Sequence, residues 1–255
     1  EHIFFGRPER DRQIENWIKT IRNLGKAGIP ILQNTWVLNA GAPIPLWRTS
    51  SEKVGRGGTE IVRFDNAIAQ QAPVTKFGTL SEDEAWANLL YFLKAIIPVA
   101  EESGVTFTLH PVDPQVPSIA GIARPVRSVA AYERLFAAIP SKAMRMTFCL
   151  GCFTQMLPPA EVYKAIRHFG SLGRIGYVHF RGIRGKIDRF DEVFPDEGDL
   201  DMVQAMRALN ESGFTGPIQP DHAPHTIADS DYGHVSHAFQ IGYLKGVLQG
   251  AGALQ

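Results

Sequence analysis

The chain has 255 residues, and its 26 basic and 26 acidic side chains give a formal net charge of zero at pH 7. That balance gives no general electrostatic reason to expect nucleic acid or an acidic membrane as a partner. No apolar run approaches the roughly 18–20 residues of a transmembrane helix, the N-terminus does not resemble a signal peptide, and two cysteines make no disulfide framework. We therefore expect a cytoplasmic protein with neither nucleic-acid nor membrane partners.

The N-terminal third predicts two helices, one strand and a long connection. Apolar residues at helical spacing predict a helix over 10–26, and an apolar run predicts a strand over 29–36. Between residues 37 and 80, glycines and prolines interrupt any period, which predicts a long irregular loop such as a lid. Ser81-Glu-Asp-Glu84 is a capping box, and it predicts the start of a helix that ends near Ser103.

From there on the chain alternates predicted strands with predicted helices. The expected strands cover 104–110, 144–150, 175–180 and 216–221, and the expected helices cover 128–138, 159–169, 200–212 and 238–248. Asp199 is the expected cap of the third of these helices, and a polar loop is expected over 182–199. Alternation of this kind predicts a parallel α/β sheet, because parallel neighbours need crossover connections.

The number of strands bears on the type of fold. A closed (β/α)₈ barrel has eight strands, whereas the patterns above, with the strand at 29–36, indicate about five. Either strands have been missed, or an N-terminal part of the barrel is not in this sequence. The prediction is a TIM barrel, with residues 1–255 forming a single partial catalytic domain.

Four of the expected strands end in residues of the types that bind metals. They finish at His110, Cys149, His179 and Asp221. Each residue alone is more often structural, as a hydrogen-bonded histidine, a small buried cysteine or an aspartate that caps a turn. Side chains at the carboxyl ends of barrel strands converge on one point, and imidazole, thiolate and carboxylate are suitable ligands for a divalent cation. The coincidence therefore predicts a metal site.

Several short stretches, in order along the chain, carry a family resemblance. They are residues 20–30, Leu109-His-Pro-Val-Asp-Pro114, Thr147-Phe-Cys149, Val178-His-Phe-Arg181, Phe190-Asp-Glu-Val-Phe194, residues 196–202 and Pro220-Asp-His222. With these stretches the chain resembles the mannonate dehydratase family. Members have a xylose-isomerase-like TIM barrel and convert D-mannonate to 2-keto-3-deoxy-D-gluconate. They begin roughly three βα units earlier in the barrel, which would account for the missing strands.

The resemblance implies a site and a reaction. It implies that the four residues at the strand ends bind Mn²⁺, with Fe²⁺ or Co²⁺ as substitutes, and that His222 and Tyr232 transfer protons. The reaction removes the C2 proton of a sugar acid and releases the C3 hydroxyl, so the chain is predicted to be a hydro-lyase. Arg181 and Arg48 are candidates to bind the substrate carboxylate, because a guanidinium forks onto two carboxylate oxygens.

Other functions stay open at this point. Gln219, Gly182 and Cys152 depart from the family pattern and leave the exact sugar acid undecided. A metal-dependent sugar isomerase or epimerase uses the same scaffold, and fold does not fix function. A non-catalytic sugar-acid-binding protein is a further alternative, and so, more weakly, is a redox protein built on Cys149 and Cys152. A homo-oligomer with a contact through the 37–80 loop is also possible from the sequence.

Overall fold

The computed structural model describes residues 1–38 and 48–252. The helices in these ranges are α1 (His2–Phe5), α2 (Arg10–Lys26), α3 (Asn66–Ala69), α4 (Glu82–Glu102), α5 (Val129–Ala138), α6 (Leu150–Met156), α7 (Pro159–Ser171), α8 (Met202–Glu211) and α9 (His234–Gly250), with a 3-10 helix η1 (Arg56–Gly58). Not one of them has the length and apolarity needed to cross a membrane.

The strands form one parallel sheet and two antiparallel ones. They are β1 (Ile31–Thr35), β2 (Ser50–Glu52), β3 (Ile61–Asp65), β4 (Thr106–His110), β5 (Ser118–Ile119), β6 (Ile122–Ala123), β7 (Met144–Cys149), β8 (Ile175–Phe180), β9 (Gly182–Lys186), β10 (Arg189–Val193) and β11 (Ile218–Pro220). The main sheet has the order β1-β4-β7-β8-β11, and its recorded pairs β1/β4, β4/β7 and β8/β11 are parallel. Each of its strands lies inside a range predicted from the sequence, so the parallel α/β prediction is confirmed.

The chain divides into two compact units. The first comprises Glu1–Pro45, Ala72–Thr147 and Gly173–Tyr177, and the second comprises Leu46–Gln71, Phe148–Leu172 and Val178–Gln255. Whether residues 1–255 behave as a single domain stays a prediction.

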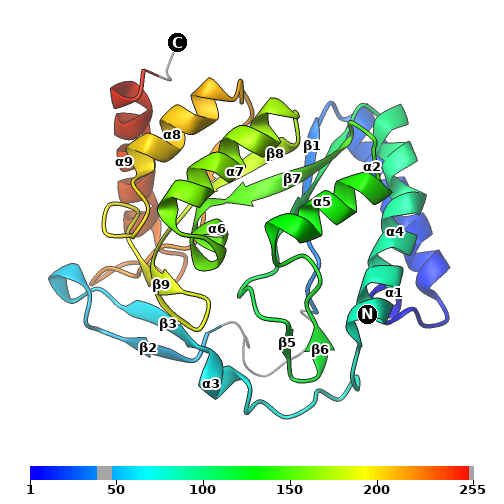
Figure 1. Ribbon diagram of the computed structural model, residues 1–255, viewed down its shortest axis with the longest axis horizontal. Coiled ribbons are helices and arrows are strands. Elements are labelled where there is room, and N and C mark those ends of the chain that lie inside the picture. The colour runs from blue at the N-terminus through cyan, green and yellow to red at the C-terminus, as the bar shows by residue number, and fades with distance from the viewer. Residues whose placement is uncertain (39–47, 253–255) are drawn as a thin grey trace. The chain divides into compact units, whose positions relative to one another are not determined.

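In the first unit, α2 and α4 pack side by side (Figure 1), and aromatic rings join them to the sheet. The ring of Trp17 on α2 lies 5.4 Å from that of Phe92 on α4 and 6.4 Å from that of Phe107 on β4. The predicted capping box is present, since the Ser81 hydroxyl accepts from the Glu84 amide and the Glu84 carboxylate accepts from the Ser81 amide. Burial of these large rings fixes α4 and β4 against each other, and β4 ends in His110.

In the second unit, two segments predicted to be irregular are partly strand. The expected loop at 37–80 includes 39–47, which lie outside the described residues, but its remainder contains β2, β3, η1 and α3. The expected polar loop at 182–199 contains β9 and β10. These strands form an antiparallel sheet in the order β2-β3-β10-β9, in which Phe64 lies opposite Phe190 with the rings 5.4 Å apart. The loop prediction was wrong here because the two hairpins, β2/β3 and β9/β10, form one sheet only where β3 pairs with β10, which lies far along the chain.

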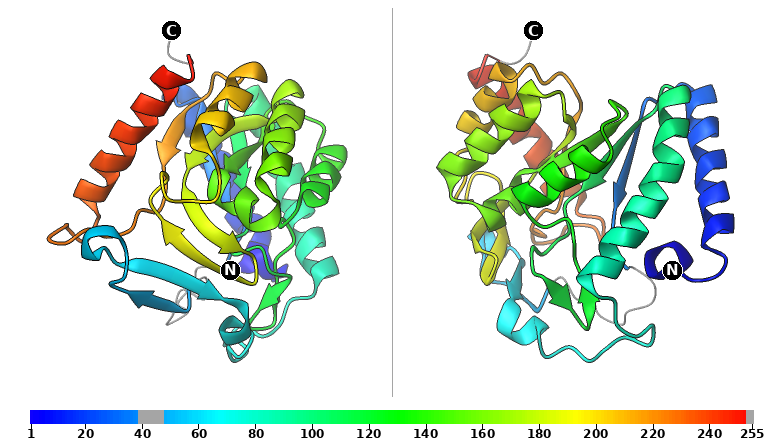
Figure 2. Two further views of the ribbon diagram at one scale, coloured as in Figure 1. Left: turned by 60° about the vertical axis from the view of Figure 1, so that its left-hand side comes forward. Right: turned by 45° about the vertical axis from the view of Figure 1, so that its right-hand side comes forward.

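The helices of the second unit pack in succession, α7 on α8 and α8 on α9, and α9 lies beside β11 (Figure 2). The cap predicted for α8 was wrong. Asp201, not Asp199, accepts from the amides of Val203 and Gln204 at the start of the helix, whereas Asp199 accepts from the Gly185 amide at 2.7 Å. The Asp199 carboxylate, which directly precedes the predicted helix, instead accepts from an amide of β9.

Candidate metal centre

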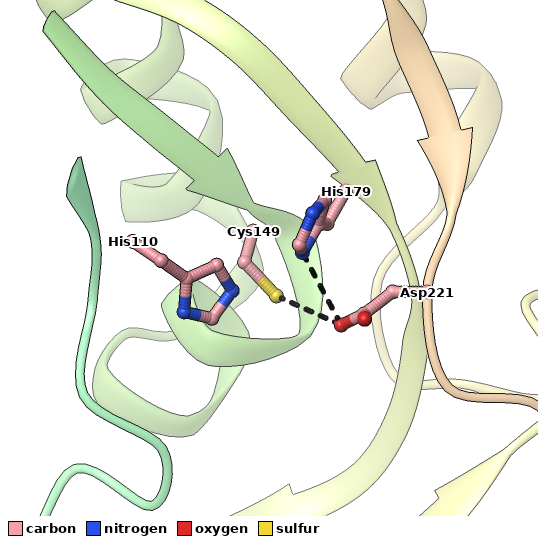
Figure 3. Close-up of side chains that lie close together, drawn as sticks. All are labelled: His110, Cys149, His179 and Asp221. Atoms are coloured by element: carbon pink, nitrogen blue, oxygen red, sulfur yellow. Dashed lines mark hydrogen bonds and ion pairs between the residues drawn. The ribbon is translucent and has the colours of Figure 1, made fainter. Parts of the chain in front are cut away.

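Three predicted ligands lie together in the second unit. Cys149 ends β7, His179 is the penultimate residue of β8, and Asp221 directly follows β11, so each comes at the carboxyl end of a parallel strand. Their ligand atoms lie within 4.8 Å of one another. The Asp221 Oδ2 atom lies 3.9 Å from the Cys149 sulfur and 3.4 Å from His179 Nδ1, and Figure 3 shows both side chains directed at it. One carboxylate oxygen therefore marks the centre of the cluster.

The thiol of Cys149 is oriented by its place at the start of α6. It is the N-cap residue of that helix, and its sulfur accepts a hydrogen bond from the Cys152 amide at 3.5 Å. The Arg181 Nη1 atom lies 3.9 Å from the same sulfur. Donors directed at sulfur suit a thiolate, which is the form of cysteine that binds metals.

The charges of His179 and Asp221 support each other. Burial lowers the pKa of His179, but the Asp221 and Cys149 side chains outweigh burial and raise it to about 10. Burial raises the pKa of Asp221, but the hydrogen bond with His179 and the charges of His222 and Arg181 hold it well below its usual range. A metal ion binds the lone pair of a neutral imidazole, so metal binding would displace one proton from the charged His179 ring. An imidazole, a thiolate and a carboxylate within this distance fit a divalent first-row metal.

The fourth predicted ligand, His110, ends β4 in the first unit and is drawn with the other three in Figure 3. It is buried, and its Nδ1 lies 2.6 Å from the carbonyl oxygen of Pro111. A carbonyl oxygen can only accept, so Nδ1 carries the hydrogen and Nε2 carries the lone pair. Metal-binding histidines typically donate their other ring N–H to such a carbonyl, so His110 has the tautomer that a ligand needs.

A second polar cluster in the same unit is centred on Glu192 of β10. The Oε1 atom of this buried carboxylate accepts hydrogen bonds from Nη2 of Arg48 and from Nη2 of Arg181. His222, which follows Asp221, places its Nδ1 2.7 Å from the same oxygen. Two side chains predicted to bind substrate, Arg48 and Arg181, and one predicted to transfer protons, His222, therefore meet at one atom of Glu192.

The charged groups around Glu192 shift one another's pKa values. Burial raises the pKa of Glu192, but the charges of Arg181, Arg48 and His222 outweigh it and hold the pKa well below its usual range, so the group is a carboxylate. Burial lowers the pKa of His222, but the neighbouring Glu192 carboxylate raises it overall. Arg181 joins this cluster to the other, because its Nη1 lies 4.0 Å from Asp221 Oδ2.

Sequence patterns did not single out Glu192, although it lies inside a stretch that carried the family resemblance. Phe190 and Glu192 are two residues apart in β10, Phe194 directly follows the strand, and all three are buried. Residues two apart in a strand face the same side of the sheet, so Glu192 places a carboxylate among phenylalanines on a buried face. A lone acidic residue in that pattern was the signal that could have found it.

Tyr232 is not part of either cluster. Its side chain is 68% exposed, and its recorded ring neighbours in the part of the chain that the structure describes are His237, with centroids 4.9 Å apart, and His234 at 5.0 Å. Its part in proton transfer stays a prediction.

Comparison with known proteins identifies the family. A family model described as D-mannonate dehydratase (UxuA) matches residues 1–77 and 67–254. The chain belongs to the mannonate dehydratase family. Mannonate dehydratase 2 of Halalkalibacterium halodurans is 30% identical over 98% of this chain and 79% of its own length. Mannonate dehydratase of Thermotoga maritima is 30% identical over 87% of this chain and 69% of its own length.

Solved structures confirm the predicted fold. The crystal structure of mannonate dehydratase from Streptococcus suis serotype 2 superposes with a TM-score of 0.84 at 27% identity, over 98% of this chain and 74% of that chain. A xylose isomerase-like TIM barrel protein from Mycobacterium smegmatis superposes with a TM-score of 0.60 at 15% identity, over 95% of this chain and 69% of that chain, and shows the fold alone. The family has the xylose-isomerase-like TIM-barrel fold, and its named members are dehydratases, which are hydro-lyases.

The second thiol beside the cluster predicts sensitivity to oxidation. Cys149 and Cys152 are both buried thiols, and the Cys152 amide donates to the Cys149 sulfur. In metal-free protein, peroxide is expected to convert Cys149 to a sulfenic acid, which releases water when the Cys152 thiol attacks it and forms a disulfide. Wild-type protein should then lose two hydrogens by mass and stop binding metal until dithiothreitol is added. Cys152→Ser should show no such mass change, and a disulfide-free wild type that loses metal binding equally would contradict the prediction.

Proposed function

We propose that this chain catalyses the metal-dependent dehydration of a sugar acid, namely D-mannonate to 2-keto-3-deoxy-D-gluconate. The proposal is carried by one observation: in a chain of the mannonate dehydratase family, the Cys149, His179 and Asp221 cluster lies next to the Glu192 and His222 pair. The proposed cofactor is Mn²⁺, for which Fe²⁺ or Co²⁺ could substitute, and the proposed location is the cytoplasm.

His110 is proposed to complete the ligand set. In the first unit β4 pairs in parallel with β7 through Leu109 and Met146, so His110 and Cys149 come at the carboxyl ends of neighbouring strands. The lone pair on His110 Nε2 suits the role. When bound, a divalent cation supplies positive charge that stabilises the anionic transition state beside the substrate carboxylate.

His222 is proposed to remove the C2 proton. The ionised Glu192 oxygen can only accept a hydrogen bond, so Nδ1 of a neutral His222 donates to it. Nε2 then has the lone pair and acts as the proton acceptor. The His222 side chain is 46% exposed, so a substrate can approach it, whereas the carboxylate behind it is buried. This leaves Tyr232 as the proposed acid that protonates the departing hydroxyl.

Of the two arginines, Arg48 is the better candidate for the substrate carboxylate. Arg181 is 1% exposed, and its Nη1 faces the sulfurs of Cys149 and Cys152 at 3.9 and 3.7 Å. A Cβ added to Gly151 would come within 3.0 Å of the Arg181 side chain, so the guanidinium is closely enclosed. These contacts favour a role for Arg181 in balancing the negative charge of the ligands.

Product analysis tests the proposal. Reduced protein is incubated with D-mannonate and Mn²⁺, and a sample treated with EDTA serves as the control. The masses of the products are then measured by mass spectrometry. We expect a metal-dependent product lighter by one water. A product of unchanged mass would indicate isomerase or epimerase chemistry, which conserves mass. No product from protein that has bound metal would exclude D-mannonate and direct the search to other sugar acids.

Replacing Tyr232 with phenylalanine tests the proposed acid. The variant removes only a hydroxyl from an exposed side chain, so folding and metal content should not change. Turnover should fall by about 10²–10⁴-fold, the range typical of general acid–base groups. The measurement is kcat at saturating metal, with Tyr91→Phe, on the exposed surface of α4, as the matched control. Unchanged turnover in Tyr232→Phe would remove this residue from the mechanism.

A further inference from the structure

We propose that Glu192 is a positioning residue whose single carboxylate oxygen sets the proton-accepting tautomer of His222, an inference that rests on the proposed dehydratase function. The geometry consists of one buried acceptor and three nitrogen donors from separate parts of the second unit. Arg48 precedes β2, Arg181 follows β8, and His222 follows β11. All three reach Oε1 of Glu192.

The backbone of Glu192 is held on both sides. It is in β10, an inner strand of the antiparallel sheet, and it pairs with Val62 of β3 on one side and with Ile183 of β9 on the other. Arg48 is followed by Thr49, whose amide donates to the carbonyl of Arg63 at 2.8 Å. Pairing on both sides holds the backbone of Glu192 rigidly, and a positioning residue needs such a rigid support.

The three donors differ in exposure, and the difference separates a positioning role from simple charge balance. Arg48 and Arg181 have side chains 8% and 1% exposed, and together they already supply more positive charge than one carboxylate can neutralise. His222 is the exposed member, at 46%. The carboxylate therefore connects two largely buried guanidinium groups to an exposed imidazole ring, as in a carboxylate–imidazole pair that holds a general base.

A second donor competes for the same ring nitrogen. Arg48 Nη2 lies 3.4 Å from His222 Nδ1. While Glu192 is ionised, Nδ1 donates to it and Nε2 keeps the lone pair. An amide at this position is a weaker acceptor than the carboxylate, and it offers an NH₂ group that can itself donate to Nδ1. Donation to Nδ1 from that NH₂ group, or from the Arg48 guanidinium, would move the ring hydrogen to Nε2. The ring would then present an N–H to the substrate instead of a base.

The test compares Glu192→Gln with Asp191→Asn. Asp191 is the neighbouring carboxylate on β10, and it pairs with Arg63 at 2.9 Å at a partly exposed position. Glu192→Gln should lower kcat by about 10²–10⁴-fold, as expected when a base is held in the wrong tautomer, while metal content and KM change little. Asp191→Asn should leave kcat within about 2-fold, because partly exposed ion pairs contribute little. Equal loss of metal and of kcat in Glu192→Gln would overturn the inference, since it would indicate support of the metal ligands instead.

A second readout does not depend on activity. Nitrogen-15 NMR of histidine-labelled protein loaded with diamagnetic Zn²⁺ distinguishes the two tautomers, and comparison with His222→Asn assigns the resonances. Wild type should carry the His222 hydrogen on Nδ1, and Glu192→Gln should carry it on Nε2. An unchanged tautomer would overturn the inference. A tautomer change in a protein without activity on D-mannonate would support the positioning role and reject the proposed reaction.

If Glu192→Gln does not fold, Glu192→Asp provides the same comparison. Aspartate keeps the negative charge but is one methylene shorter, so it cannot hold all three donors at one oxygen. We expect it to retain metal and to lose part of kcat, with a mixture of tautomers at His222. Wild-type kcat and a wild-type tautomer in this variant would also overturn the inference.

Discussion

Replacing Asp221 with asparagine is expected to abolish tight metal binding and, with it, turnover. One oxygen of Asp221 lies close to both the Cys149 sulfur and His179 Nδ1, so it occupies the centre of the ligand cluster. Asparagine has the same shape but no charge, and it removes one of the two carboxylates beside Arg181, the other being Glu192. Metal affinity should fall at least about 100-fold, because loss of an outer-shell partner alone costs roughly 10–100-fold.

Metal content after dialysis and thermal unfolding measure this effect. A ligand at 100 times its Kd adds about 2.7 kcal/mol to the free energy of unfolding, so Mn²⁺ should raise the Tm of wild type and leave that of Asp221→Asn unchanged. Asp191→Asn, a carboxylate-to-amide change outside the cluster, should respond to Mn²⁺ as wild type does. Tight Mn²⁺ binding by Asp221→Asn would exclude Asp221 from the ligand set.

The parallel sheet could be predicted from the sequence because its signals are local. An apolar run such as 175–180 is buried in the sheet whatever its partners are, and the capping box at Ser81 places the start of α4 without tertiary information. The antiparallel sheet has no such signal. Its strand β2 is short, polar and exposed, and β9 contains two glycines and two basic residues, so only pairing with β3 and β10 makes them strands.

The residues of the candidate site also fall into a predictable group on the parallel sheet and an unpredicted one on the antiparallel sheet. Cys149, His179 and Asp221 lie at the carboxyl ends of apolar strands. Parallel strands bring these ends to one edge of the sheet, so the proximity of the three residues follows from the order of the elements. Glu192 reaches the site through the antiparallel sheet that the sequence did not reveal. Its contacts with Arg48 and His222 join segments whose pairing is set by tertiary structure. Glu192, the site residue that sequence patterns missed, is therefore positioned by the sheet that they also missed.

Replacing His222 with asparagine is expected to leave the metal bound and to lower kcat by about 10²–10⁴-fold, the usual contribution of a general base. The ring contacts Glu192 at 2.7 Å but lies 3.7 Å from Asp221 Oδ1, so its loss removes the proposed base while the ligand carboxylate remains. His225→Asn, an exposed histidine three residues further on, is the matched control. Loss of metal from His222→Asn would show that this side chain supports the ligands instead of transferring a proton.

The double variant Glu192→Gln/His222→Asn decides whether the carboxylate acts through the imidazole. If Glu192 serves to hold His222, its replacement has little left to remove once His222 is absent, and the double variant should be no slower than His222→Asn alone. Groups that act as a unit show this kind of non-additivity. If Glu192 acts on its own, through Arg48 or through the packing of the sheet, the two losses in kcat should multiply. Because Arg181 joins Glu192 to Asp221, metal content must be measured in all three variants, so that a loss of cofactor is not taken for a loss of the base.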